Sequence, residues 1–160
     1  MRELFETDLK GKLYGFVPHC KLLDTYFISG YWKKLLKDRG LDYYFGGLFL
    51  ADIAKFREEY GYSEYLRRSY QRFTQDEINE NLVLMDQDLI NYAQINIPIH
   101  RLSTKWLWCE AWCDKEDEEQ AMIIDFCTDP YMLKESKFER AKRIIHDYQE
   151  QYEDIIYLLS

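Results

Sequence analysis

The chain has 160 residues, of which 47% are hydrophobic and 17% aromatic, a composition typical of a globular protein rather than a disordered one. Its net charge is −8, and no segment combines clustered positive charge with interleaved aromatic residues, so nucleic acid is not expected as a partner. No apolar run reaches the roughly 18 to 20 residues that span a bilayer, and the ends resemble neither a signal peptide nor a lumenal retention tetrapeptide. Nothing marks a domain boundary, so a single unit over residues 1–160 is expected.

The first clear element is a strand followed by a helix. Residues 43–51 form a short aromatic and apolar run between Gly40 and Asp52, which predicts a buried strand. Asp52 is suited to cap a helix over residues 53–60. The pair predicts a strand-to-helix unit of an α/β sheet.

A second helix is predicted from Thr74 and Glu77, which have the spacing of a capping box. The helix that they open would carry Leu82, Met85 and Leu89 on one face.

The next elements are less regular. Pro98 and residues 101–105 indicate a return loop, and the acidic residues 114–120 indicate a solvated turn. Residues 121–126 are apolar and predict a short strand that carries Asp125 at its tip.

The last segment predicts one long helix. Its apolar residues recur in steps of three and four and therefore share one stripe. They are Phe138, Ala141, Ile145, Tyr148, Tyr152, Ile155 and Leu159. Packing of this stripe on the domain's own sheet is the favoured interpretation over a coiled-coil partner, and an exposed stripe would be a docking face.

The densest group of polar residues is Asp86, Gln87, Asp88 and Asn91. At helical spacing, Asn91 shares a face with both Gln87 and Asp88, so one surface presents a carboxylate and amides suited to sugar hydroxyls. The structural alternative is a solvated helix start at which Asp86 caps the backbone.

Two groups of residues each have two interpretations. They are the four cysteines and three of the four tryptophans. Cys20, Cys109, Cys113 and Cys127 form either two disulfides, with three possible pairings, or buried thiols. The Cys-x3-Cys spacing without a nearby His pair is poor for zinc. Trp106 and Trp112 either stack on sugar rings or belong to the core, whereas Trp108 is expected in the core.

Several motifs, in order, resemble the catalytic domain of the UDP-glucose:glycoprotein glucosyltransferase family, glycosyltransferase family 24. They are Gly15–Cys20, Ser29–Trp32, Tyr44–Asp52 with Lys55–Arg57, Met85–Asn91, Trp106–Asp114, Ile124–Pro130 and Lys134–Lys137. The resemblance implies the second half of an α/β nucleotide-sugar domain of the GT-A, Rossmann-like type. The family's metal-binding Asp-x-Asp pair would precede Met1, and residues 1–7 look like the helix that follows it.

The resemblance also implies site roles. Asp86, Gln87, Asp88 and Asn91 match the family's donor-glucose loop, with Gln87 opposite the leaving group and Asp88 nearest a developing oxocarbenium ion. Asp125 matches the third ligand of a divalent cation, calcium or manganese, on the donor's diphosphate. Without the resemblance, Asp125 reads as a strand-end residue that caps the next turn.

Four further residues belong to the implied donor site. Gly46 and Gly47 replace the Ser-Ala that the family usually carries, which admits close approach of a sugar or diphosphate but removes a hydroxyl. Lys134 and Lys137 match two lysines suited to phosphate, and ordinary surface lysine is the simpler alternative.

The leading interpretation is a retaining glucosyltransferase domain that transfers glucose from UDP-glucose to the high-mannose N-glycan of misfolded glycoproteins in the endoplasmic reticulum lumen. Retention requires a carboxylate nucleophile or a same-face displacement, and the sequence does not choose. The acidic half would be encoded just upstream or form a separate chain, and substrate selection by the family's folding-sensor region would come from another chain or not occur. The alternatives are a noncatalytic remnant that binds a partner through its last helix and, third, a glycoside hydrolase with paired carboxylates.

Overall fold

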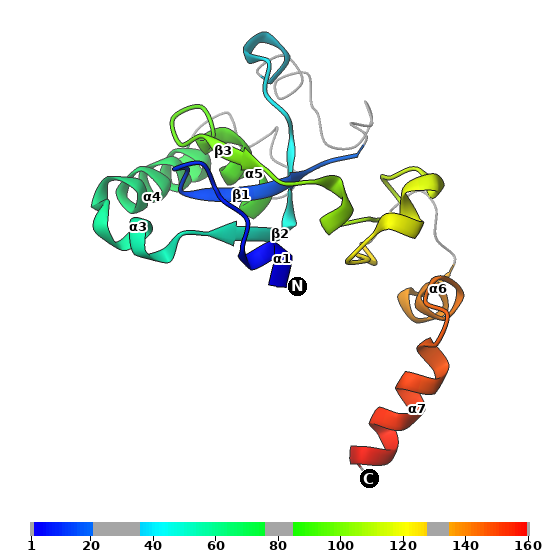
Figure 1. The fold of residues 1–160 in the computed structure, drawn as a ribbon. Coiled ribbons are helices and arrows are strands. Elements are labelled where there is room, and N and C mark those ends of the chain that lie inside the picture. Colours follow the sequence, from blue (N-terminus) through cyan, green and yellow to red (C-terminus); the bar gives the residue numbers. More distant parts are fainter. Residues whose placement is uncertain (1, 21–35, 76–84, 128–134, 160) are drawn as a thin grey trace.

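The protein is built on a small mixed sheet with helices on its faces (Figure 1). The computed structural model describes residues 2–20, 36–75, 85–127 and 135–159. Within these residues the sheet has three strands in the order β2-β1-β3, namely β1 Tyr14–Pro18, β2 Tyr44–Ala51 and β3 Ile99–Arg101. The central strand β1 is buried along its length, antiparallel to β2 and parallel to β3. The predicted α/β class is confirmed, and the strand predicted over residues 43–51 is observed from Tyr44. Its predicted burial is wrong, because only Tyr44 is buried and the rest of β2 is half-buried or exposed.

The pairing of β2 with β1 contains a bulge. Phe16 of β1 pairs with Phe49, but the next residue of β1, Val17, pairs with Phe45, so the β2 residues between them have no partner in β1. The unpaired residues are Gly46, Gly47 and Leu48. β2 changes direction at this point (Figure 1). Glycine suits it, because a Cβ on Gly47 would lie 2.5 Å from Cε1 of Phe45.

One face of the sheet is covered by three helices, α3 Ile53–Glu58, α4 Tyr60–Gln75 and α5 Met85–Ala93. Their partly buried residues pack on a core of strand and loop residues. That core consists of Leu13, Tyr14, Phe16, Tyr44, Ile97 and Ile99. Asp52 caps α3 as predicted by accepting from the backbone N–H of Lys55, and α3 ends at Glu58, two residues before the predicted end.

The predicted helix start at Thr74 is wrong. Thr74 lies inside α4, which begins at Tyr60. Tyr62, Tyr65 and Leu66 of α4 pack on the core, and this tertiary contact fixes a helix that the local capping signature did not reveal. Glu77 and Leu82 lie outside the described residues.

The other face is covered by the short helix α1 Arg2–Phe5 and by η2 Thr104–Trp106. Leu4, Val17, Leu102, Trp106 and Leu107 form the core there. The predicted loop over residues 101–105 is partly wrong, because β3 extends to Arg101 by pairing with β1.

Close packing of β1 against β3 depends on Gly15. A Cβ on Gly15 would lie 3.1 Å from the carbonyl oxygen of His100 and 3.0 Å from Cδ2 of Leu9. A larger residue would require these neighbours to shift by a few tenths of an ångström, so glycine favours the close approach of β1 and β3.

The segment after the sheet is irregular. Residues 115–120 form the exposed helix η3 Lys115–Gln120, which confirms the predicted solvated turn. The predicted strand over residues 121–126 is wrong, since Ile124 makes only an isolated parallel bridge with Trp108. Backbone bonds from Trp108 N to Ile123 O (2.9 Å) and from Asp125 N to Trp108 O (2.7 Å) hold the segment without a ladder.

The predicted long C-terminal helix is two helices, α6 Lys137–Ile144 and α7 Tyr148–Leu159. Ile145 between them is extended, with φ −95° and ψ 111°. The break folds Phe138 edge-on against Tyr148 and Tyr152, so part of the predicted stripe packs on itself at the corner.

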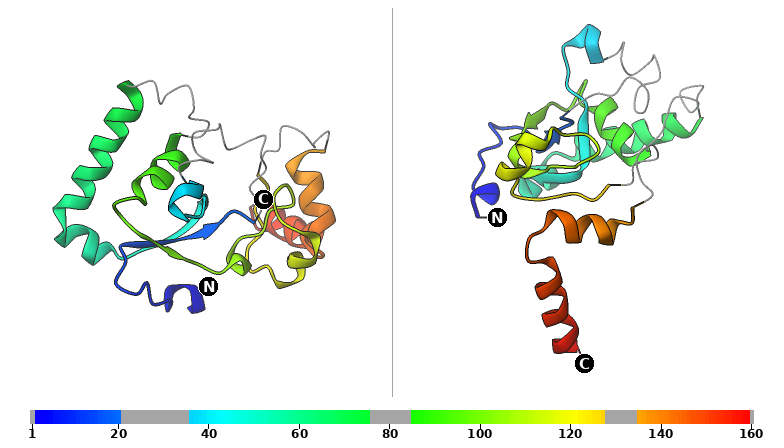
Figure 2. Two further views of the ribbon diagram at one scale, coloured as in Figure 1. Left: turned by 90° about the horizontal axis from the view of Figure 1, so that it is seen from above. Right: turned by 90° about the vertical axis from the view of Figure 1, so that its right-hand side faces the viewer.

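Helix α7 points away from the sheet (Figures 1 and 2). None of its residues is buried, so the favoured packing of the stripe on the domain's own sheet is wrong. Ile155, Ile156, Leu158 and Leu159 are exposed. Within the described ranges, no helix combines the length and apolarity needed to cross a bilayer.

Candidate functional site

The polar face of α5 lies against strand β2. The side-chain amide of Asn91 accepts from Tyr44 N at 2.7 Å and donates to Tyr44 O at 2.8 Å, as a neighbouring strand would. The same nitrogen also donates to Gln87 O at 2.9 Å, and Asn91 has no exposed surface. Asn91 therefore anchors α5 to the backbone of β2.

Gln87 continues this contact one turn earlier. Its Oε1 accepts from Gly46 N at 2.9 Å, so the backbone N–H of the first unpaired bulge residue is satisfied by a side chain. A Cβ on Gly46 would meet Oε1 of Gln87 at 3.6 Å, an ordinary contact. Gln87 thus holds the bulge that contains Gly46 and Gly47.

Asp88 is fully buried beside a tyrosine. The Tyr43 hydroxyl donates to Oδ1 of Asp88 at 3.0 Å and accepts from Nε2 of Gln87 at 3.3 Å. Three of the four predicted cluster residues, Gln87, Asp88 and Asn91, are therefore brought together. Asp86 lies in α5, and its side chain is outside the described part of the chain. The solvated helix start that formed the structural alternative does not apply to the three buried residues.

An aromatic bridge joins this cluster to the cysteine-rich segment. The ring of His19 lies 5.6 Å from that of Tyr43, 5.0 Å from Phe45 and 5.9 Å from Trp112, centroid to centroid. Burial lowers the pKa of His19 to about 4, so its imidazole is neutral at physiological pH. A small cavity with room for about one water molecule lies between His19, Phe45, Trp112 and both disulfides.

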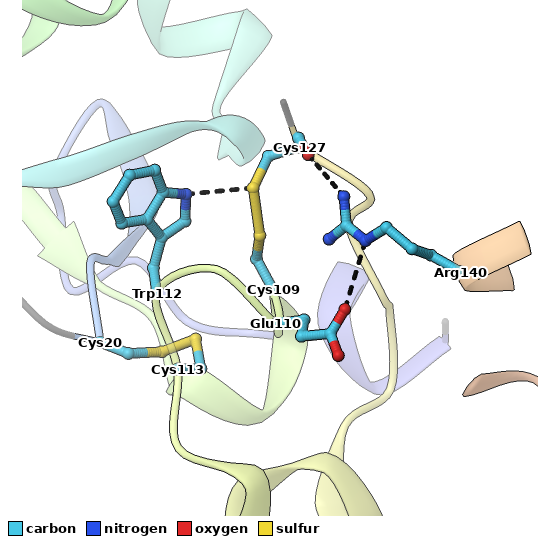
Figure 3. Close-up of a disulfide and its surroundings, with 7 residues drawn as sticks. All are labelled: Cys20, Cys109, Glu110, Trp112, Cys113, Cys127 and Arg140. Atoms are coloured by element: carbon cyan, nitrogen blue, oxygen red, sulfur yellow. Dashed lines mark hydrogen bonds and ion pairs between the residues drawn. A yellow bond between two sulfur atoms is a disulfide. The ribbon is translucent and has the colours of Figure 1, made fainter. Parts of the chain in front are cut away.

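The four cysteines form two disulfides, Cys20–Cys113 and Cys109–Cys127 (Figure 3). The first ties the end of β1 to the tryptophan-rich turn, and the second closes the segment that contains Asp125. The sequence left disulfides and buried thiols open, and the structure contains disulfides.

Trp106, Trp108 and Trp112 are core residues. Trp108 is 2% exposed, as predicted, and Trp106 and Trp112 are 3% and 4% exposed. Nε1 of Trp112 donates to Sγ of Cys127 at 3.0 Å (Figure 3). Neither Trp106 nor Trp112 presents an open ring face to a sugar in this arrangement, and of the two uses considered for them the core is the one observed.

Asp125 lies half-buried beside the Cys109–Cys127 disulfide. Its carboxylate and the two sulfurs are within 4.8 Å of one another, but disulfide sulfurs are not thiolate ligands. Burial raises the pKa of Asp125, and the positive charges of Lys137 and Arg140 oppose that rise. The described residues thus supply one hard oxygen ligand, which fits part of a calcium or manganese site and does not complete it.

A partly buried ion-pair cluster adjoins Asp125. Arg140 of α6, 1% exposed, donates from Nη1 to Cys127 O at 2.9 Å and from Nε to Glu110 at 3.2 Å (Figure 3). Arg143 binds both oxygens of Glu110, at 2.8 and 3.0 Å. The hydrogen bonds from Arg143 are the main reason that the pKa of Glu110 is lowered.

Other side chains connect the two groups of predicted site residues, the α5 cluster and Asp125. The α5 cluster reaches the Asp125 segment through Tyr43, His19 and Trp112. Lys137 is exposed at the start of α6, near enough to Asp125 to influence its charge, and Lys134 lies outside the described residues.

Sequence reasoning missed four residues around the site, Tyr43, His19, Glu110 and Arg140. The first three lie inside or directly beside motifs quoted from the sequence, which was the available signal. Arg140 carried none, because a helical arginine is usually solvated.

Comparison with known proteins identifies the family. The family model described as Glucosyltransferase 24 matches residues 1–158. The probable UDP-glucose:glycoprotein glucosyltransferase A of Dictyostelium discoideum is 37% identical over 153 residues, which cover 92% of this chain and 9% of that protein. UDP-glucose:glycoprotein glucosyltransferase 1 of Homo sapiens is 38% identical over 160 residues, 97% of this chain and 10% of that protein.

A third relative, the UDP-glucose:glycoprotein glucosyltransferase of Drosophila melanogaster, is 32% identical over 165 residues, 100% of this chain and 10% of that protein. The chain therefore spans about a tenth of the length of the curated relatives that it matches. Because the family match covers nearly the whole chain, the protein belongs to the glucosyltransferase 24 family.

Proposed function

We propose that the chain is part of a retaining glucosyltransferase domain that transfers glucose from UDP-glucose. The observation that carries this proposal is the family match over residues 1–158, together with relatives whose names state UDP-glucose:glycoprotein glucosyltransferase. The mixed α/β sheet supports the finer assignment to the second half of a GT-A, Rossmann-like domain over residues 1–160.

The donor glucose is assigned to the β2 bulge and the start of α5. Asn91 positions α5, because its amide is occupied by backbone groups. Gln87 fixes Gly46 and Gly47, where the backbone admits close approach of a sugar or diphosphate. A carboxylate such as Asp88, removed from water, stabilises an oxocarbenium ion more strongly than an exposed one, which supports its proposed role. Asp86 is proposed as the fourth residue of the donor site from its place in the sequence motif.

The diphosphate is assigned to the Asp125 side of the site. Asp125 would supply one ligand to a calcium or manganese ion, whose chemistry when bound is to neutralise charge on the departing UDP. Lys134 and Lys137 would add positive charge near the phosphates. The remaining ligands are assigned to an Asp-x-Asp pair of the longer domain.

The acceptor and the compartment follow from the same family. The relatives' names support a glycoprotein acceptor, proposed here as the high-mannose N-glycan of misfolded proteins. Two disulfides support an oxidising compartment, proposed as the endoplasmic reticulum lumen. A folding-sensor region would be supplied by other parts of the polypeptide or by a partner.

The test is calorimetric titration of UDP-glucose with Mn²⁺ or Ca²⁺ into the chain, with and without a polypeptide that carries the acidic pair. We expect binding only with the acidic pair, and loss of the metal-dependent part in Asp125→Ala. Asp117→Ala, at an exposed position in η3, is the matched control and should bind normally. Metal-dependent binding retained by Asp125→Ala would remove Asp125 from the metal site.

A noncatalytic partner-binding role is the second candidate, favoured by the exposed apolar end of α7. If this role is correct, UDP-glucose will not bind under any of these conditions. The glucosyltransferase proposal would then fail while the fold remained intact.

A further inference from the structure

Arg140 is unusual among the described arginines because its guanidinium is inside the protein. It is 1% exposed, although it lies on α6, at the edge of the domain. A buried guanidinium is costly unless its donors are satisfied. Here it contacts a carboxylate, that of Glu110, and a backbone carbonyl, that of Cys127, and its cation also lies 5.8 Å from the centroid of the Phe126 ring.

Both hydrogen-bond acceptors belong to the ends of the Cys109–Cys127 disulfide loop. Glu110 follows Cys109, and the second acceptor is the carbonyl of Cys127 itself (Figure 3). Arg140 therefore ties α6 to both ends of the loop at once. A disulfide joins the two side chains but leaves the orientation of the peptide group at Cys127 unspecified.

The carbonyl that Arg140 holds is two residues after Asp125. The backbone on the other side of Asp125 is held as well, since Asp125 N donates to Trp108 O at 2.7 Å. The backbone around Asp125 is thus fixed at its own N–H and at Cys127 C=O, and only the second bond comes from a side chain.

We propose that Arg140 is a positioning residue that fixes the backbone of residues 125–127 and thereby aims the Asp125 carboxylate at the donor's cation. This inference rests on the proposed function for the role of Asp125, but the fixing of the backbone does not depend on it. The positive charge of Arg140 also opposes the effect of burial on Asp125. Partners that orient a metal ligand typically change metal affinity by about 10- to 100-fold when removed.

Arg143 provides the matched control. It lies on the same helix and binds both oxygens of the same Glu110, but its side chain is 45% exposed and its described contacts are to Glu110 and Glu135. Removal of Arg143 weakens the attachment of α6 without touching the Cys127 carbonyl. A role of Arg140 limited to the attachment of α6 would lower the melting temperature without a selective change in exchange of the Asp125 amide.

The experiment compares three variants, Arg140→Met, Arg140→Lys and Arg143→Met. Amide hydrogen exchange of residues 121–127 is measured without metal, and thermal melting measures stability. Metal-dependent binding of UDP-glucose is measured by titration with the acidic-pair polypeptide present. Arg140→Lys retains a charge but cannot reach both acceptors with a planar fork. It keeps the test decisive if Arg140→Met does not fold.

We expect exchange of the Asp125 amide to be about tenfold faster in both Arg140 variants and unchanged in Arg143→Met. Metal-dependent donor affinity should fall by about tenfold in the same two variants only. The inference would be overturned if the Asp125 amide exchanged at the wild-type rate in folded Arg140 variants. It would also be overturned if Arg143→Met changed exchange and donor affinity as much as the Arg140 variants do. If the unsubstituted chain binds no donor, the proposed function fails, and the exchange data still decide whether Arg140 fixes the segment.

Discussion

Two regions of the molecule are stabilised in different ways. One is the sheet with α5, and the other is the Cys109–Cys127 disulfide loop with α6. On the sheet side, neutral amides of Asn91 and Gln87 occupy backbone groups of β2, at the buried Tyr44 and the half-buried Gly46. On the loop side, two disulfides and an arginine cluster around Glu110 join segments that have no regular strand.

The difference shows how each half of the candidate site is fixed. A helix anchored to strand backbone at two successive turns has a defined register, so Gln87 and Asp88 follow from the placement of Asn91. An irregular loop has no register, so Asp125 depends on individual cross-links. The sheet side should therefore lose stability when hydrogen bonds are removed, and the loop side when covalent or ionic links are removed.

The largest expected effect comes from removal of a disulfide. Cys20 and Cys113 are 93 residues apart and Cys109 and Cys127 are 18 apart, so the chain-entropy model gives losses of about 4–5 and about 3 kcal/mol for the two Cys-to-Ser pairs. Chemical denaturation of each double variant measures the difference. An equal or reversed order would mean that loop closure does not decide how this region is stabilised.

The sheet side is tested by Asn91→Ala. This change leaves the N–H and C=O of Tyr44 without their side-chain partner, and we expect a loss of about 3 kcal/mol of unfolding free energy. Asn96→Ala, at an exposed position, should lose less than about 1 kcal/mol. If both variants unfold at the same urea concentration, Asn91 does not anchor α5.

The bridge between the two regions is tested by pH. Because burial lowers the pKa of His19 from 6.5 to about 4, the unfolded chain binds its proton first as the pH falls. The stability associated with His19 is complete above its unfolded pKa and is lost as the pH drops toward about 4. From pH 7 to 4.5 we expect this loss to be about 2 kcal/mol, and His19→Phe should remove it.

The pH profile of His19→Phe is compared directly with that of the unsubstituted chain. The same loss of stability in His19→Phe as in the unsubstituted chain would show that His19 is not buried as a neutral ring.

The smallest effect is expected in α7. Leu158 is 81% exposed, so Leu158→Gln should change the unfolding free energy by less than about 0.5 kcal/mol, whereas Leu102→Ala in the core should cost about 2–5 kcal/mol. A loss above about 1 kcal/mol in Leu158→Gln would indicate that α7 packs on the domain in solution.

The sequence by itself determined the α/β class, the strand up to Ala51, the Asp52 cap and the family. It also grouped Gln87, Asp88 and Asn91, because residues one turn apart on a helix share a face whatever surrounds them. These features depend on local periodicity or on motifs of adjacent residues, both of which are visible in one dimension.

Tertiary structure alone decided the remaining features. The sequence left three cysteine pairings open, predicted a single C-terminal helix, and gave no reason to bury Arg140. The observed pairing and the contacts of Arg140 depend on residues brought together by folding, and the break at Ile145 places Phe138 against Tyr148 and Tyr152. Contacts such as Cys20–Cys113 and Glu110–Arg140 join residues far apart in the chain, and local patterns contain no information about which distant groups will meet.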